Sequence, residues 1–209
     1  FNPAIPMYKN EIESRGIQFN YERFCKPLIK NYMLEDLFEE GAEEVKNVFL
    51  EENDDGNYRL KEEFNTQRKV EDHFIANPLE NKEQENLLKN GLFTLIGNVL
   101  FFEEPGSDGN AFHPKIAFHS TYSYKELDDH IKGVLNDIYT HYYYHRQENF
   151  WREQAMVKLP AINKASDMLI CGEDLGMVPD CVPGVMHELG ILRLYIQRMP
   201  KETDSEFGH

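Results

Sequence analysis

Apolar residues recur at helical spacing through most of the first 165 residues of the chain. The longest such stretch begins at Ser123, which stands three residues before Glu126 in a capping-box pattern, and Pro160 and the following Ala-Ile-Asn-Lys (161–164) mark its end. Its apolar face is formed by Ile131, Val134, Leu135, Ile138 and Tyr142. We therefore expect one long amphipathic helix in this part of the chain.

Shorter helices are predicted before this stretch, at about 11–50, 66–77 and 81–98, from mixed three- and four-residue spacings of apolar side chains. The segment 51–60, EENDDGNYRL, has acidic and turn-forming residues ahead of Gly56 and predicts an exposed loop.

A β-type pattern replaces the helical one at 98–104, NVLFFEE, and the turn sequence PGSDGN follows it. The segment 113–121, HPKIAFHST, is predicted as a short strand that pairs with the first one.

Beyond residue 165 the pattern changes again. The run 167–172, DMLICG, is continuously apolar, which is typical of a strand covered on both faces. A short helix at 180–191 and a β-type run at 191–199 follow it. A strand, a helix and a strand in this order form a βαβ unit, which requires a parallel sheet. Two strands are too few for such a sheet, so we expect the chain to be a piece of a longer protein.

The predicted fold class is therefore α/β, in two regions. Residues 1–165 form a mostly helical region, and residues 166–209 form part of an α/β sheet or barrel.

Composition narrows the possible partners. The chain has 209 residues and a formal charge of −15, from 37 acidic and 22 basic side chains. Such a surface repels phosphate backbones, so nucleic acid is a poor candidate partner. No apolar run is long enough to cross a membrane. The three cysteines have neither the spacing of a metal site nor that of a disulfide framework. We therefore interpret them as structural thiols that stay reduced in a cytoplasmic setting.

The strongest candidate chemistry is the acidic pair that follows the apolar run 167–172. Glu173 and Asp174 stand where catalytic residues collect in parallel α/β folds, just beyond the carboxyl end of a strand. A carboxyl group there can protonate a leaving oxygen. The alternative is that the pair caps the next helix or neutralises an arginine.

Other patterns carry weaker signals. His141 and His145 have a metal-compatible i, i+4 spacing, but no third ligand is evident, so an amphipathic helix explains them better and no metal or cofactor is expected. An aromatic cluster could stack on sugars or simply pack in a core. Its members are Tyr139, Tyr142, Tyr143, Tyr144, Phe150 and Trp151.

Two segments, ICGEDLGMVPDCVPGVM (170–186) and LRLYIQRMPK (192–201), resemble the 4-alpha-glucanotransferases of glycoside hydrolase family 77. The similarity extends upstream through FNPAIPMYKNEI, GIQFNYERFCKP, EFNTQRKVEDHF, HPKIAFHSTYSYKEL and YYYHRQENFWREQAMVKLP. It is closest to the branch of the family in which a long insertion separates the two catalytic carboxylates.

The resemblance implies a retaining (β/α)8 barrel, with residues 1–165 as the insertion and 166–209 as barrel segment. It makes Glu173 the general acid/base and Asp174 its neighbour in the loop. It also places Gln197 or Arg198 at the glucan cleft, whereas Tyr195 stands where many relatives have an acidic residue. The family's aspartate nucleophile (Arg-x-Asp-His) and stabilising aspartate (Thr-His-Asp) have no counterpart in this sequence, so they would lie before Phe1 and after His209.

The implied reaction is transfer of α-1,4-glucan segments from maltose or maltodextrin donors to sugar or glucan acceptors by double displacement. The isolated piece is expected to be inactive. Two alternatives stay open, a hydrolase of α-1,4-glucans and a non-catalytic module for glucan binding or oligomerisation. The helical region itself is expected to bind larger acceptors, to mediate subunit contacts or to act as a scaffold.

Overall fold

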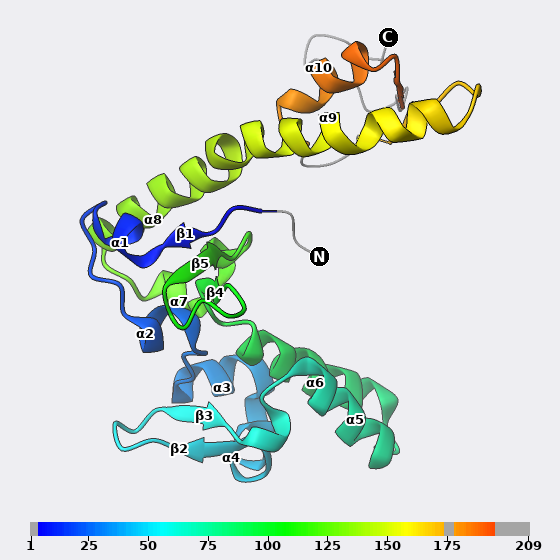
Figure 1. Cartoon of the computed structure of the whole chain (residues 1–209). Helices are drawn as coiled ribbons and strands as arrows, with labels where there is room; N and C mark the ends of the chain where they lie inside the picture. Colours follow the sequence, from blue (N-terminus) through cyan, green and yellow to red (C-terminus); the bar gives the residue numbers. More distant parts are fainter. Residues whose placement is uncertain (1–3, 174–177, 195–209) are drawn as a thin grey trace, which may run out of the picture. The chain divides into compact units, whose positions relative to one another are not determined.

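The computed structural model describes residues 4–173 and 178–194. The chain forms two compact units (Figure 1). One is made of Pro6–Tyr139, and the other of Phe1–Ile5 together with Thr140–His209. Each unit is described by itself below.

Four helices and a β-hairpin build one half of the unit Pro6–Tyr139 (Figure 1). The helices are α3 (Asn31–Phe38), α4 (Ala42–Phe49), α5 (Gln67–Ala76) and α6 (Lys82–Ile96), and short 3-10 turns stand at Glu39–Gly41 and Glu62–Phe64. Their apolar faces share one core, which includes Val45, Phe49, Val70, Phe74, Leu92 and Leu95. Side-chain caps start two of the helices, with Thr66 bonded to the Lys69 N–H and Asn81 to the Glu83 N–H.

The hairpin corrects the sequence-based prediction of an exposed loop at 51–60. Strand β2 (Leu50–Glu52) pairs antiparallel with β3 (Tyr58–Leu60), so that Leu50 lies opposite Leu60. Both leucines are buried in the shared core, and their packing stabilises the hairpin. The acidic residues between them made this segment look like an exposed loop in the sequence.

The other half of this unit is a small antiparallel sheet in the order β1–β5–β4, with helices α1 (Lys9–Glu13) and α2 (Tyr21–Cys25). The strands are β1 (Met7–Tyr8), β4 (Phe101–Glu103) and β5 (Ala111–Pro114). The predicted strand at 98–104 is confirmed. Its predicted partner is shifted, because β5 begins before residue 113 and a 3-10 turn (Phe118–Ser120) occupies the end of that segment. Phe19 packs its ring against Phe101 and Phe112 at the centre of this layer.

The long helix predicted from Ser123 to Pro160 is divided in the structure. It consists of α7 (Tyr122–Lys125), α8 (Asp129–His141), a π-helical turn (Tyr142–Arg146) and α9 (Gln147–Ala165). The predicted start is wrong. The cap of α7 is Thr121, whose hydroxyl accepts the Tyr124 N–H, whereas Ser123 is fully buried inside the helix. Helix α9 includes Pro160 and ends at Ala165, directly after the residues 160–164 at which its end was predicted.

The predicted βαβ unit is confirmed. Strand β6 (Cys171–Gly172) pairs in parallel with β7 (Leu192–Arg193), and helix α10 (Cys181–Glu188) connects them. Helix α10 lies alongside α9 (Figure 1). The run 167–172 was predicted to be covered on both faces. It is not covered in this chain, since the side chains of Met168 and Leu169 are 77% and 70% exposed. No helix among the described residues is long and apolar enough to cross a membrane.

Candidate functional site

Glu173 directly follows strand β6, at the carboxyl end of the parallel pair. Its side chain is exposed. The Leu194 N–H, just after β7, donates to the Gly172 carbonyl over 3.1 Å, so the two strands end at the same edge. This is the edge at which parallel α/β folds place their reacting groups.

The glycine before Glu173 lies in close contact with the elements that follow it. A Cβ atom at Gly172 would stand 2.7 Å from the Met186 methyl carbon and 3.3 Å from a methyl group of Ile191. Side chains of α10 and of the residue before β7 thus pack directly against the backbone of β6. A larger residue at position 172 would require the flexible end of Met186 to move.

Helix α9 holds α10 and its ends through four polar contacts. The Glu148 carboxylate accepts the backbone N–H groups of Asp180 (3.0 Å) and Cys181 (2.8 Å), at the start of α10. Two more contacts hold the far end of α10, where Arg152 pairs with Glu188 and the Asn163 amide donates to the Leu189 carbonyl. Glu148 and Arg152 were not among the residues predicted from the sequence to support the site. Their i, i+4 spacing on one face of a predicted helix was the available signal.

Two of the three cysteines have raised thiol pKa values, as expected for structural thiols. Burial, followed by the hydrogen bond to Glu148, raises the pKa of Cys181 to about 11. Burial likewise raises the pKa of Cys25 to about 12. Cys171, on β6, is exposed, and all three cysteines are free.

Of the predicted site residues, the structure describes Glu173, which follows Gly172 at the end of β6. The other predicted site residues, Asp174, Gln197 and Arg198, lie outside the described residues, as does Tyr195. Among the residues that the structure describes, no group of three or more His, Cys, Asp or Glu side chains is placed to hold a metal ion. His141 ends α8 and His145 lies in the π-helical turn.

The predicted aromatic cluster does not form one exposed patch. Tyr142 is buried and packs edge-to-face on Tyr143, whereas Tyr144 is 47% exposed. Tyr139 packs on Phe118 in the unit Pro6–Tyr139. The core-packing interpretation fits Tyr139 and Tyr142.

Comparison with known proteins gives a family match for the part of the chain that contains Glu173. Residues 111–209 match the family model described as 4-alpha-glucanotransferase, glycoside hydrolase family 77. The family match includes Glu173 and both strands of the βαβ unit.

A curated member of this enzyme class is similar over the whole chain. It is the 4-alpha-glucanotransferase DPE2 of Oryza sativa subsp. japonica, with 38% identity over 211 residues. The alignment covers 100% of this chain and 22% of the rice protein, so the chain spans about a fifth of the length of this relative. No solved structure is significantly similar to the chain.

Proposed function

We propose that the chain is part of a 4-alpha-glucanotransferase and that Glu173 is its general acid/base. The observation that carries the proposal is the position of Glu173 at the carboxyl end of β6 in a parallel βαβ unit, within the residues that match the family. The similarity to the rice 4-alpha-glucanotransferase supports α-1,4-glucans, maltose or maltodextrins as substrates.

In the proposed reaction, Glu173 donates its proton to the oxygen of the glycosidic bond that breaks, as a second carboxylate attacks the sugar carbon. A covalent glycosyl-enzyme forms with the non-reducing-end part of the donor, and the reducing-end part leaves with the glycosidic oxygen as its new, protonated 4-hydroxyl group. Glu173 is now a carboxylate, and it takes the proton of an acceptor sugar hydroxyl that attacks the same carbon. The chain contains neither Arg-x-Asp-His nor Thr-His-Asp, so other parts of the enzyme would supply the nucleophile and the stabilising carboxylate.

The exposed apolar side chains of the βαβ unit support a larger α/β fold around it. Met168 and Leu169 precede β6, and Leu192 and Leu194 on and after β7 are 49% and 47% exposed. Parallel strands are normally covered on both faces. We therefore propose that residues 166–209 are a segment of a (β/α)8 barrel whose other strands and helices cover these side chains. The mostly helical residues 1–165 are the proposed insertion, and Asp174, Gln197 and Arg198 are proposed to lie at the glucan cleft.

The test uses the full-length enzyme with maltotriose and with α-maltosyl fluoride. Glu173→Ala should lose most turnover of maltotriose, because its leaving group needs a proton. The same variant should still release fluoride from maltosyl fluoride in a burst, because fluoride leaves without protonation. Glu153→Gln, at an exposed carboxylate of α9, is the matched control and should keep both reactions.

Three outcomes separate the candidate functions. Maltotetraose and maltose formed from two maltotrioses indicate transfer, whereas release of reducing ends without longer products indicates hydrolysis. Glucan binding with no turnover in the wild type would indicate a binding module. Near-wild-type turnover of maltotriose by Glu173→Ala would show that Glu173 is not the general acid/base.

A further inference from the structure

The unit Pro6–Tyr139 contains a groove of about 800 Å³ that the proposed reaction does not use. It lies between helix α2 with the segment after it and the hairpin β2–β3, and Phe102 of β4 also lines it. Pockets for small ligands typically measure about 300–1,000 Å³, so this groove is large enough for several sugar rings.

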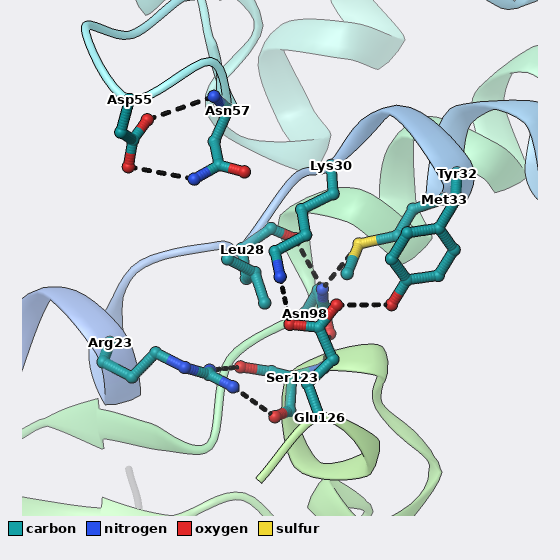
Figure 2. A network of polar contacts seen from close by, with 10 residues as sticks. All are labelled: Arg23, Leu28, Lys30, Tyr32, Met33, Asp55, Asn57, Asn98, Ser123 and Glu126. Carbon is teal, nitrogen blue, oxygen red and sulfur yellow. Dashed lines mark hydrogen bonds and ion pairs between the residues drawn. The ribbon is translucent and has the colours of Figure 1, made fainter.

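The two main walls of the groove are fixed to each other and to the unit. The Tyr58 N–H of the hairpin donates to the Ile29 carbonyl over 2.9 Å. The tip of the hairpin is held by Asp55, which accepts both the backbone and the side-chain N–H of Asn57 (Figure 2).

The wall formed by α2 and the segment after it contains Arg23, and buried hydrogen-bond partners hold this wall in place. The Arg23 guanidinium contacts the hydroxyl and the carbonyl of Ser123, and the Ser123 N–H donates to buried Asn98 (Figure 2). The Asn98 amide in turn donates to the Leu28 carbonyl over 2.6 Å. A groove with rigid walls loses little entropy when a ligand binds.

Four amide side chains line the groove, those of Asn20, Asn53, Asn57 and Asn65. Among the described residues, the half-buried side chain of Asn53 has no hydrogen-bond partner, although its backbone N–H closes the hairpin on the Asn57 carbonyl. An amide carries two donors and an acceptor, so this group is suited to a ligand with adjacent hydroxyls.

Two aromatic side chains, Phe102 and Tyr58, line the groove together with these amides. Phe102 is 51% exposed although it lies on a strand whose neighbour Phe101 is fully buried. The half-buried ring of Tyr58 also lines the groove. Flat apolar rings next to planar polar groups can pack on the apolar face of a sugar ring while its edge is hydrogen-bonded.

The charges of the groove argue against an ionic ligand. Three cations (Arg23, Lys26 and Arg59) and two carboxylates (Glu22 and Asp55) line it, which leaves a net charge of only +1. Arg23 is engaged by Ser123, and Arg59 pairs with Glu51 at 3.0 Å. The groove therefore fits a neutral, hydroxyl-rich ligand better than a phosphate or a nucleic acid.

From this lining we infer that the groove between α2 and the hairpin β2–β3 binds a neutral oligosaccharide, and specifically an α-1,4-glucan chain. The choice of an α-glucan among neutral saccharides rests on the proposed function. A second glucan site of this kind would hold a long donor or acceptor chain on the enzyme between turnovers.

The test measures amide hydrogen exchange in the full-length protein with maltoheptaose, a fully soluble α-glucan. Exchange in peptides that cover 53–60 should slow on addition of maltoheptaose. It should be about tenfold slower when the ligand stands at ten times its half-saturating concentration, because opening then competes with binding. Inulin, a fructan of similar size, should have no effect.

Variants separate the groove from other glucan sites of the enzyme. Phe102→Ala and Asn53→Ala, singly and together, should raise the maltoheptaose concentration needed for this protection by about tenfold or more in the double variant. Leu87→Ala, at an exposed leucine of α6, is the matched control and should leave the response unchanged. Circular dichroism checks that each variant is folded, and Phe102→Ala alone suffices if the double variant is not.

The outcomes are distinct from those of the proposed function. No protection at 53–60 in the wild type, or equal protection in the double variant, would overturn the groove inference. Turnover of maltotriose by the same wild-type preparation tests the transferase proposal independently. Protection of 53–60 without turnover of maltotriose would support glucan binding in the groove and contradict the transferase proposal.

Discussion

The Glu148 carboxylate of α9 accepts the backbone N–H of Cys181 over 2.8 Å, at the first residue of α10. The second carboxylate oxygen accepts the Asp180 N–H. A carboxylate at a helix N-terminus satisfies donors that have no partner within the helix and is favoured by the helix dipole. The long helix of the chain thereby fixes the end of the loop that begins at Glu173.

Glu148→Ala should release the start of α10. The loss of a side-chain cap typically costs about 1 kcal/mol, which corresponds to a several-fold faster amide exchange in 181–188. Glu148→Gln keeps an acceptor oxygen and should fall between the wild type and the alanine variant. Glu153→Ala, on the same helix but exposed, is the control. If exchange in α10 is the same in Glu148→Ala and Glu153→Ala, the cap does not stabilise the helix.

Gly172→Ala tests the close approach of α10 to β6. The new methyl group would force Met186 to move, since 2.7 Å is too short for two carbon atoms. Because the atom in conflict is the flexible end of a methionine side chain, the cost should be at the low end for overpacking, about 1 kcal/mol of unfolding free energy. The same change should cost less in a Met186→Ala background, because the side chain in conflict is then absent. Urea unfolding of the four proteins measures this coupling, and purely additive costs would contradict the predicted contact.

The sequence predicted elements best where local pattern and packing agree. The apolar face of α8 includes Leu135 and Ile138, which are fully buried as the helical spacing predicts. The parallel βαβ unit also follows from sequence, since an apolar run, a short helix and a second β-type run leave few other arrangements. Gly190, at a φ of +66° after α10, ends that helix as predicted.

Prediction failed where tertiary contacts override a local signal. Pro160 lacks an N–H and disfavours the interior of a helix. The last turn of α9 nevertheless includes it and ends at Ala165, close to the predicted end, and Asn163 in this turn donates to the Leu189 carbonyl. Ser123 has the spacing of a capping residue, but Arg23, a hundred residues away in sequence, takes its hydroxyl and carbonyl. Neither contact is visible in a sequence window.

The candidate site was predictable only in part, for a related reason. Glu173 follows a recognisable strand, but Glu148 reaches the same loop from a helix, and no local pattern links residue 148 to residue 181. The groove was missed because its lining comes from three segments, and the hairpin that forms one wall was predicted as a loop.

Asn98→Asp should destabilise the unit Pro6–Tyr139. The Asn98 side chain is buried, donates to the Leu28 carbonyl and accepts the Ser123 N–H (Figure 2). The aspartate keeps the acceptor but places a second oxygen against the Leu28 carbonyl. Removal of one partner from a buried hydrogen bond costs about 1–3 kcal/mol, and a buried charge adds to this. Thermal unfolding measures the loss, which should be smaller at pH 4 than at pH 7 because protonation restores a donor. Equal losses at the two pH values would argue against this geometry.

Glu85 should make stability depend on pH. It is buried at the start of α6, and the hydrogen bonds from Lys82 and from the Leu79 N–H lower its pKa to about 2. A carboxylate whose pKa is lowered on folding stabilises the protein above its unfolded pKa of about 4.3 and loses this effect as the pH falls toward 2. Glu85→Gln should therefore unfold at a lower temperature than the wild type at pH 7, and the difference should shrink between pH 4 and pH 2. Glu83→Gln, at an exposed position of the same turn, is the control. A difference that stays constant with pH would show that the charge of Glu85 is not responsible.

Thiol labelling should report on what covers strand β6. At pH 8 the thiolate fraction of Cys181, with a pKa of about 11, and of Cys25, with a pKa of about 12, is far below that of an ordinary thiol. Cys171 is exposed in this chain, so iodoacetamide should modify Cys171 first in the isolated 209-residue protein. In the full-length enzyme, the proposed barrel would bury β6 on both faces and protect the same thiol. Mass spectrometry of peptides after timed labelling compares the two proteins. Equal modification of Cys171 in both would mean that the rest of the enzyme does not cover this strand, and the barrel proposal would fail even if the transferase activity were present.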